Sequence, residues 1–224
     1  MRHLTATICL TIAVLLGSAG VTLPVFAEGN STQKEKSEDA EFLRGFAAIK
    51  NFNRALKAQK SGDFSHSYEA FRPLAEFGLP AAQHNLAYLY ETGKGTRQDI
   101  SKAVHWYEKA GQQGYVQSQV NLALMYTRGS GVPKDHQKAF FWWKKAAENG
   151  FTTAQAVLGA GYMEGKLQRK NLVKAHMWLS IAASSDFAKA KDLLSAVAEQ
   201  LTPDQIAEAQ KLARECVRKK YKGC

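Results

Sequence analysis

Residues 81–114 read AAQHNLAYLYETGKGTRQDISKAVHWYEKAGQQG, and residues 118–150 repeat this pattern as SQVNLALMYTRGSGVPKDHQKAFFWWKKAAENG. Around these segments, the same residue types return every 36 positions in three successive units. The recurring positions are Gly78, Gly114 and Gly150; Leu86, Leu122 and Leu158; Tyr90, Tyr126 and Tyr162; Gly93, Gly129 and Gly165; Ala103, Ala139 and Ala175; Trp106, Trp142 and Trp178; and Ala110, Ala146 and Ala182. A fixed period of this length predicts a solenoid, in which each unit buries its apolar face against its neighbours.

Each unit is expected to form two helices. In the first unit, residues 81–91 carry apolar side chains at helical spacing, and Gly93 follows where glycine commonly ends a helix. The second helix is expected to begin after Asp99, which Asp135 and Asn171 match in the next two units. Because aspartate and asparagine are preferred N-cap residues, this position is suited to start a helix in every unit.

The pattern weakens at both ends of the array. The third unit has Val157 and Leu167 where earlier units have asparagine and glycine, while Asp63 lies one period before Asp99 and indicates a degenerate unit ahead of Gly78. Terminal units of solenoids are atypical because one side faces a cap or water. We therefore expect an all-α fold, an α/α solenoid of about four helix pairs with a C-terminal capping helix.

Both ends of the chain carry their own signals. Arg2, a short apolar stretch at 8–16 and the small-residue site before Glu28 predict a secretory signal peptide cleaved after Ala27, with an uncleaved anchor as the alternative. At the other end, the segment TPDQ beginning at Thr202 predicts a capping box. The expected divisions are a signal peptide at 1–27, a disordered leader at 28–41, a degenerate repeat at 42–77, repeats at 78–113, 114–149 and 150–185, and a helical cap at 186–224.

After cleavage, Cys216 and Cys224 are the only thiols of the chain. An even pair in an exported chain favours a disulfide, and two unpaired cysteines are the alternative. The spacing is not one that indicates a metal site, because no histidine follows Cys216.

The two quoted segments closely resemble the Sel-one-like repeat (SLR), a relative of the tetratricopeptide repeat. Alanine, glutamine, asparagine-leucine, tyrosine, glycine, aspartate, lysine-alanine and tryptophan recur in order over about residues 63–186. This resemblance implies a right-handed α/α solenoid whose first helices line a concave surface. It also implies an adaptor or scaffold, and many bacterial members of the family are periplasmic or secreted.

Catalysis has little support in the sequence. No nucleophile elbow, zinc-protease motif, P-loop or dinucleotide fingerprint occurs, and the S-x-x-K match at Ser31 lies in the expected leader without its partner motifs. Some cysteine-rich SLR proteins are associated with β-lactams, but their cysteine pair in each repeat is missing from the repeats here. We expect no enzyme, no cofactor and no metal. A β-lactam- or wall-active enzyme remains the third alternative.

Histidines and tryptophans are the side chains of this chain best suited to metal binding and to ring stacking. His66, His84, His105, His136 and His176 share no repeat position, which favours scattered surface residues over a metal site. Trp106, Trp142 and Trp178 are interpreted as packing residues rather than as a stacking ladder, because they coincide with core positions of the resembled family. Trp143 is expected to be half-buried.

The net charge is +10, and +9 once Arg2 is removed with the signal peptide. Such a charge attracts anionic polymers, so binding of peptidoglycan or another anionic envelope polymer by the basic surface is the second hypothesis. The alternative is that lysine and arginine only keep the helices soluble. Nucleic acid is not expected as a partner, because the chain is exported and carries no binding motif. No transmembrane segment is expected after cleavage.

The leading hypothesis is a non-catalytic periplasmic adaptor that binds a protein or peptide through the concave surface. The tetratricopeptide relative's concave positions, carried onto the first helix of each unit, differ between units, as a surface not fixed by packing can. Ordinary exposed helix residues are the alternative interpretation. The expected contact residues are His84, Tyr88 and Glu91 in unit one; Val120, Leu124, Thr127 and Arg128 in unit two; and Ala156, Ala160, Met163 and Glu164 in unit three.

Overall fold

The computed structural model describes residues 33–166, 168–185 and 187–224. The described chain is helical and contains no strand. Its helices are α2 (Gln33–Lys60), α3 (Phe64–Glu76), α4 (Pro80–Thr92), α5 (Ile100–Gln112), α6 (Val116–Arg128), α7 (His136–Glu148), α8 (Thr152–Glu164), α9 (Leu172–Ala183), α10 (Ala188–Ala198) and α11 (Pro203–Arg218). The expected signal peptide, together with Leu167 and Asp186, lies outside the described residues.

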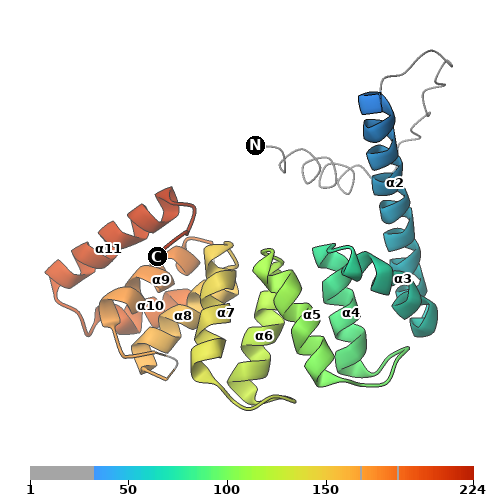
Figure 1. The fold of residues 1–224 in the computed structure, drawn as a ribbon. Coiled ribbons are helices and arrows are strands. Elements are labelled where there is room, and N and C mark those ends of the chain that lie inside the picture. The colour runs from blue at the N-terminus through green and yellow to red at the C-terminus, as the bar shows by residue number, and fades with distance from the viewer. Residues whose placement is uncertain (1–32, 167, 186) are drawn as a thin grey trace.

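Consecutive helices pack in antiparallel pairs that follow one another in a row (Figure 1). Each helix also contacts the helix that comes next along the chain, from α2 through to α10. One continuous core of buried apolar side chains therefore runs from Ala55 to Cys216. The expected all-α solenoid is confirmed.

The recurring polar and glycine positions end and start the helices as expected. The side-chain oxygens of Asp99, Asp135 and Asn171 accept backbone N–H bonds of 3.0, 2.9 and 2.9 Å at the starts of α5, α7 and α9. Gly93 ends α4 with φ of +69°, and its equivalents end α6 and α8 in the same left-handed conformation. This conformation favours glycine, which explains why the residue recurs.

Buried glutamines connect each unit to the one before. Nε2 atoms of Gln83, Gln119 and Gln155 donate to backbone carbonyls eight residues earlier, at 3.1, 2.7 and 3.3 Å. These carbonyls lie in the last turn of the preceding helix, and each also accepts the backbone N–H of the glycine that follows that helix, Gly78, Gly114 or Gly150. The glutamine column is therefore a structural link between units and not a surface feature.

The tryptophans differ from one another in burial. Trp142 and Trp178 are buried, whereas Trp106 is only partly buried and has the Lys109 ammonium 4.7 Å from its ring. The expectation of a half-buried Trp143 is wrong, because its side chain is 5% exposed. It occupies the repeat position of two fully buried residues, and its Nε1 donates to Thr127 Oγ1 at 3.3 Å.

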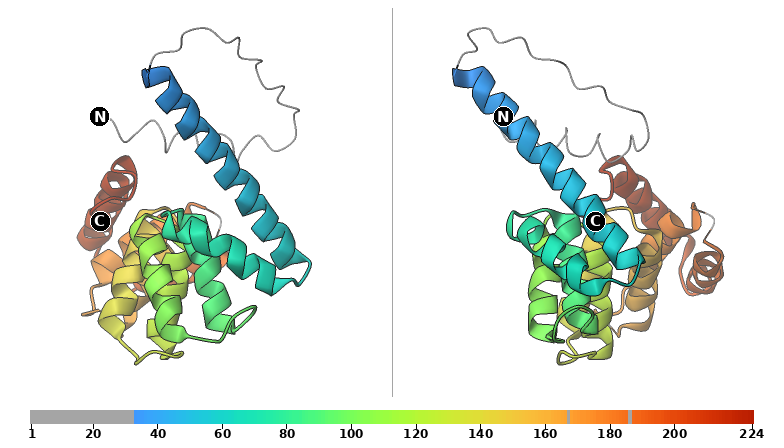
Figure 2. Two further views of the ribbon diagram at one scale, coloured as in Figure 1. Left: turned by 45° about the vertical axis from the view of Figure 1, so that its right-hand side comes forward. Right: turned by 90° about the vertical axis from the view of Figure 1, so that its right-hand side faces the viewer.

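Helix α2 begins at Gln33 rather than near Phe42, so residues 33–41 of the expected leader belong to a helix. Glutamine, lysine, glutamate and alanine in this stretch are good helix formers, and they extend a helix whose C-terminal half packs on α3. Figure 2 shows the N-terminal part of α2 extending away from the array. Phe52 of α2 packs edge-on against Phe71, with ring centroids 5.5 Å apart.

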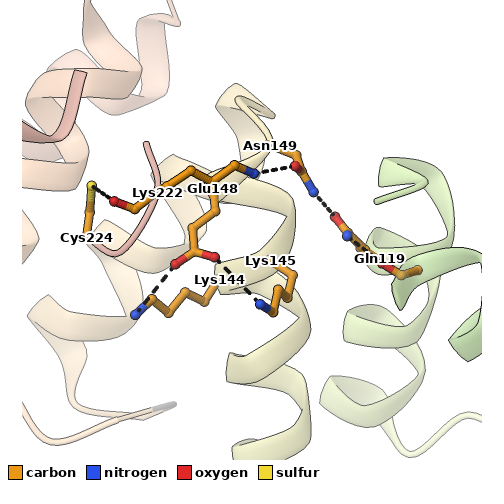
Figure 3. Close-up of polar contacts among 8 residues, drawn as sticks. Gln119, Lys144, Lys145, Glu148, Asn149, Lys222 and Cys224 are labelled. Carbon is orange, nitrogen blue, oxygen red and sulfur yellow. Dashed lines mark hydrogen bonds and ion pairs between the residues drawn. The ribbon is translucent and has the colours of Figure 1, made fainter. Parts of the chain in front are cut away.

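The C-terminal cap departs from the pairing of the array. Helix α11 packs on α9, and the expected capping box is present at Thr202. The expected Cys216–Cys224 disulfide is also present and joins residues whose Cα atoms lie 5.6 Å apart. The loop that it closes returns to the array, where Lys222 Nζ donates to Asn149 Oδ1 (Figure 3).

Candidate functional site

The expected contact residues lie on α4, α6 and α8, the first helices of the three units. We call the outward-facing surface of these three helices the A face. Most of the expected residues on it are partly buried, and Arg128 and Glu164 are exposed. Ala156 is the exception, because it is 6% exposed and packs in the core. The prediction that Ala156 contacts a partner is therefore corrected: its small side chain is covered by neighbouring helices.

His84 is held between units instead of pointing freely outward. Its Nδ1 lies 2.9 Å from Ser118 Oγ, and its ring packs against Tyr107 and Tyr115 with centroid distances of 5.4 and 5.0 Å. Burial lowers the pKa of His84 to about 4. The imidazole is therefore neutral at pH 7, and it contributes to the contact of α4 with α6.

Glu91 and Thr127 also have partners inside the array. Tyr107 Oη donates to Glu91 Oε2 at 2.7 Å, and burial followed by this hydrogen bond raises the pKa of Tyr107. Thr127 Oγ1 donates to the Ala123 carbonyl at 2.6 Å and accepts from Trp143. Both side chains thus help to orient the second helix of their own unit, which restricts what they can offer a partner.

Tyr88, Leu124 and Ala160 form the central column of the A face, one residue in each unit. All three side chains are partly buried. Lys94 Nζ donates to Tyr88 Oη at 3.0 Å and so fixes the tyrosine ring at one end of the column. Val120 and Met163 flank the column and pack partly against the core. The column therefore combines apolar side chains with a polar group at the Tyr88 end.

One further column of the A face was not among the expected contacts. Asn85, Asn121 and Val157 are as partly buried as the central column. The Asn85 Nδ2 donates to the Ala81 carbonyl at 2.8 Å, within its own helix. Asparagine recurs at this position in two units, whereas the expected contact positions differ from unit to unit, so these surface positions were not predicted.

The expectation of scattered surface histidines is wrong for His176, which is 4% exposed. Its Nδ1 lies 3.2 Å from Ser180 Oγ, one turn further along α9, and burial lowers its pKa. Within the described part of the chain, no three histidine, cysteine, aspartate or glutamate side chains gather as metal ligands would.

The Sel1 repeat profile matches three consecutive segments, residues 80–115, 116–151 and 152–187. A Sel1 repeat protein from Oxalobacter formigenes, known from its crystal structure, is 35% identical and superposes with a TM-score of 0.52. The match covers 56% of this chain and 95% of that protein. The chain belongs to the Sel1 repeat family. Sel1 repeat proteins generally act as scaffolds for protein interactions and are generally of a non-catalytic adaptor type.

A second solved structure similar to this Sel1 repeat protein is a protective antigen present in uropathogenic Escherichia coli strains, which displays an SLR fold. It is 24% identical with a TM-score of 0.46, and the match covers 85% of this chain and 51% of the antigen. The chain described here thus spans about half the length of that antigen. No curated protein matches this chain. Among the described helices of this chain, none is both long and apolar enough to cross a bilayer.

Proposed function

We propose that this Sel1 repeat protein is a non-catalytic adaptor that binds a protein or peptide along the A face. The central column supports this proposal, because Tyr88, Leu124 and Ala160 place one partly exposed side chain in each unit at equivalent positions. An extended peptide or an amphipathic helix laid across the units would contact all three. In the columns on either side, His84, Glu91 and Thr127 are already engaged within the array.

Charge at the C-terminal ends of α6 and α8 would orient the partner. Arg128 ends α6 and Glu164 ends α8, and both side chains are exposed. Glu164 forms an ion pair of 2.8 Å with Lys166, while Arg128 has no ion-pair partner among the described residues. A partner with a carboxylate near Arg128 would gain a favourable contact at the rim, which sets orientation more than affinity.

In this proposal, the adaptor acts in the periplasm or outside the cell. The signal peptide expected at residues 1–27 supports export, and the Cys216–Cys224 disulfide suits an oxidising compartment. N-terminal sequencing of the protein isolated from cells, combined with fractionation, tests this point. A mature chain beginning at Glu28 is expected, and an intact N-terminus in the cytoplasmic fraction would contradict it.

Substitution of the central column tests the adaptor function. Tyr88→Glu and Leu124→Glu, alone and together, should abolish capture of partners by a photoreactive residue placed at position 160. Phe141→Glu is the matched control, because Phe141 is 49% exposed on α7 and lies outside the A face. Circular dichroism checks that all variants keep the helical content of the parent. Unchanged capture by the double variant would refute the assignment of the A face.

A further inference from the structure

The two edges of the array carry very different charge. Loops that lead from the first helix of a unit to the second lie along one edge, the lower edge in Figure 1. We call this the loop edge and represent it by residues 93–102, 129–138 and 165–174, of which Leu167 lies outside the described residues. The opposite edge holds the turns between units, half a period away. We call it the turn edge and represent it by residues 75–84, 111–120 and 147–156.

Nearly all the excess positive charge of the repeats belongs to the loop edge. Its three segments contain nine cationic side chains and two carboxylates. The cations are Lys94, Arg97, Lys102, Lys134, Lys138, Lys166, Arg169, Lys170 and Lys174. The three turn-edge segments, of equal length, contain no lysine or arginine and the two carboxylates of Glu76 and Glu148. The cap brings Lys222 to the turn edge, where Asn149 binds it.

One lysine in each unit is held at the loop edge by a tyrosine. The ammonium groups of Lys102, Lys138 and Lys174 lie 5.4, 5.1 and 5.6 Å from the ring centroids of Tyr90, Tyr126 and Tyr162. A cation within about 6 Å of an aromatic ring is attracted to it. The tyrosines are buried and recur in register, so they fix three ammonium groups at one repeat spacing.

One of the two carboxylates at the loop edge forms an ion pair: Asp99 Oδ2 lies 3.3 Å from Lys102 Nζ, whereas Asp135 forms no ion pair with a described residue. Asp99 and Asp135 are the N-caps of α5 and α7, and each accepts backbone N–H bonds there. The third unit has neutral Asn171 at this position, so its segment contains four cations and no carboxylate. Just outside the segments, Glu164 pairs with Lys166, and Arg128 adds another positive charge.

We infer that the loop edge binds a linear phosphate polymer that runs across the three units. This surface is separate from the A face, so the inference does not depend on the adaptor function. Arg97, Lys134 and Lys170, one in each loop, are exposed and form no hydrogen bond or ion pair through their side chains with any described residue. Their charges are available to a ligand without loss of an internal contact.

The composition of the loop edge favours a phosphate chain over a nucleic acid. Recognition of single-stranded nucleic acid relies on aromatic rings on which bases stack, but the tyrosines at this edge are buried beneath lysines. Affinity here comes from charge, through release of the counterions condensed on the polymer. A phosphate chain condenses counterions densely, and lysine is a common phosphate ligand. Binding should therefore increase with chain length, because each further unit engages at a high effective concentration.

Binding of long-chain inorganic polyphosphate to the full mature chain tests the inference. Arg97→Glu/Lys134→Glu/Lys170→Glu should weaken binding about tenfold or more and should reduce the salt dependence of log K. The matched control is Lys189→Glu/Lys211→Glu/Arg214→Glu, which makes the same change in net charge at exposed positions away from the loop edge. The control should stay within about twofold of the parent.

Further arms of the experiment decide the ligand class. Tripolyphosphate should bind far more weakly than the long chain, and single-stranded DNA or polyglutamate of similar length should bind less tightly than polyphosphate. Equal losses in the two triple variants would show a general charge effect and overturn the inference. Absence of length dependence, or tighter binding of DNA or polyglutamate, would also overturn it. Loss of peptide capture through the A face is not expected in either triple variant.

A gain in affinity provides an independent test. Asp99→Asn/Asp135→Asn should keep both helix caps, because Asn171 caps α9 in the same way with a bond of 2.9 Å. The change removes both carboxylates from the loop edge, so polyphosphate should bind several-fold more tightly. Unchanged or weaker binding by a double variant of normal helicity would overturn the inference.

Discussion

Lys222 Nζ donates to Asn149 Oδ1 at 2.7 Å, although the two residues are 73 positions apart. Asn149 Nδ2 in turn donates to Gln119 Oε1 at 3.0 Å, and Gln119 Nε2 donates to the Gly111 carbonyl at 2.7 Å. Figure 3 shows the first two of these contacts beside Cys224. The disulfide-closed loop is thus connected through side-chain amides to the middle of the array.

Removing the disulfide should destabilise the cap. Cys216→Ser/Cys224→Ser is expected to lower the free energy of unfolding by about 2–3 kcal/mol, because the open chain gains conformational entropy when unfolded. Lys222→Met, which removes only the hydrogen bond to Asn149, should cost about 1 kcal/mol or less. Urea unfolding followed by circular dichroism measures both. A double variant as stable as the parent would contradict the structural role of the loop.

The stability of the protein should fall as the pH drops below the ordinary pKa of histidine. His84 has a folded-state pKa of about 4, below its unfolded value of 6.5, so the unfolded chain takes up the proton first. The stabilisation is complete above pH 6.5 and is lost progressively down to about pH 4. Allowing for partial exposure, we expect a loss on the order of 1–2 kcal/mol.

His84→Gln should flatten this pH dependence, whereas His105→Gln should leave it unchanged. His105 is exposed on α5 and serves as the matched control. Thermal unfolding at several pH values distinguishes the two variants. His176 contributes in the same direction, because burial also lowers its pKa. An identical pH slope in His84→Gln and the parent would show that another group causes it.

Gly111 leaves room for the indole of the next unit. A Cβ at this position would lie 2.9 Å from Cζ3 of Trp142. Gly111→Ala should therefore destabilise the protein by about 1–2 kcal/mol, even though alanine favours a helix by about 1 kcal/mol over glycine. In a Trp142→Phe background the clash is relieved, and the same change should become neutral or stabilising. Additive effects in the double-mutant cycle would exclude direct contact between the two side chains.

Gln119 should be more important for stability than its exposed neighbours. Gln119→Leu leaves the Gly111 carbonyl and Asn149 Nδ2 without this partner, which we expect to cost about 1–3 kcal/mol. Gln117→Leu, an exposed position on the same helix, should change stability by less than about 0.5 kcal/mol. Chemical denaturation compares the two. Similar effects of both changes would argue against a structural role for the glutamine column.

Sequence periodicity predicted the helices of the array and their ends because caps depend on local chemistry. Asp99 accepts the N–H of Lys102, three residues away, and the αL turn at Gly93 needs only the absence of a Cβ. The disulfide was also predictable, because Cys216 and Cys224 are the only cysteines outside the expected signal peptide. Burial of Trp143 was missed, since the residue beside it carried the recurring indole and the register alone did not indicate that both indoles face the core.

The candidate site was predicted only in outline. Position in the register placed Tyr88 and Leu124 on the A face, where they are partly exposed. It could not show that His84 and Glu91 are engaged by side chains of neighbouring helices, because those partners come from 16 to 34 residues away. Nor could it show that Ala156 is covered, since a small side chain at a variable position fits either environment.

By itself, the sequence determined the repeat unit, its helix boundaries and the family, because each depends on residues within one period. Only the folded arrangement of the units brings the positive charges of the three loops to one edge of the array. Arg97, Lys134 and Lys170 are far apart along the chain, and they share one edge only because every unit reverses direction at the same point and stacks in register. The long-range bond of Lys222 to Asn149 has the same origin, since packing of α11 on α9 returns the chain to the array.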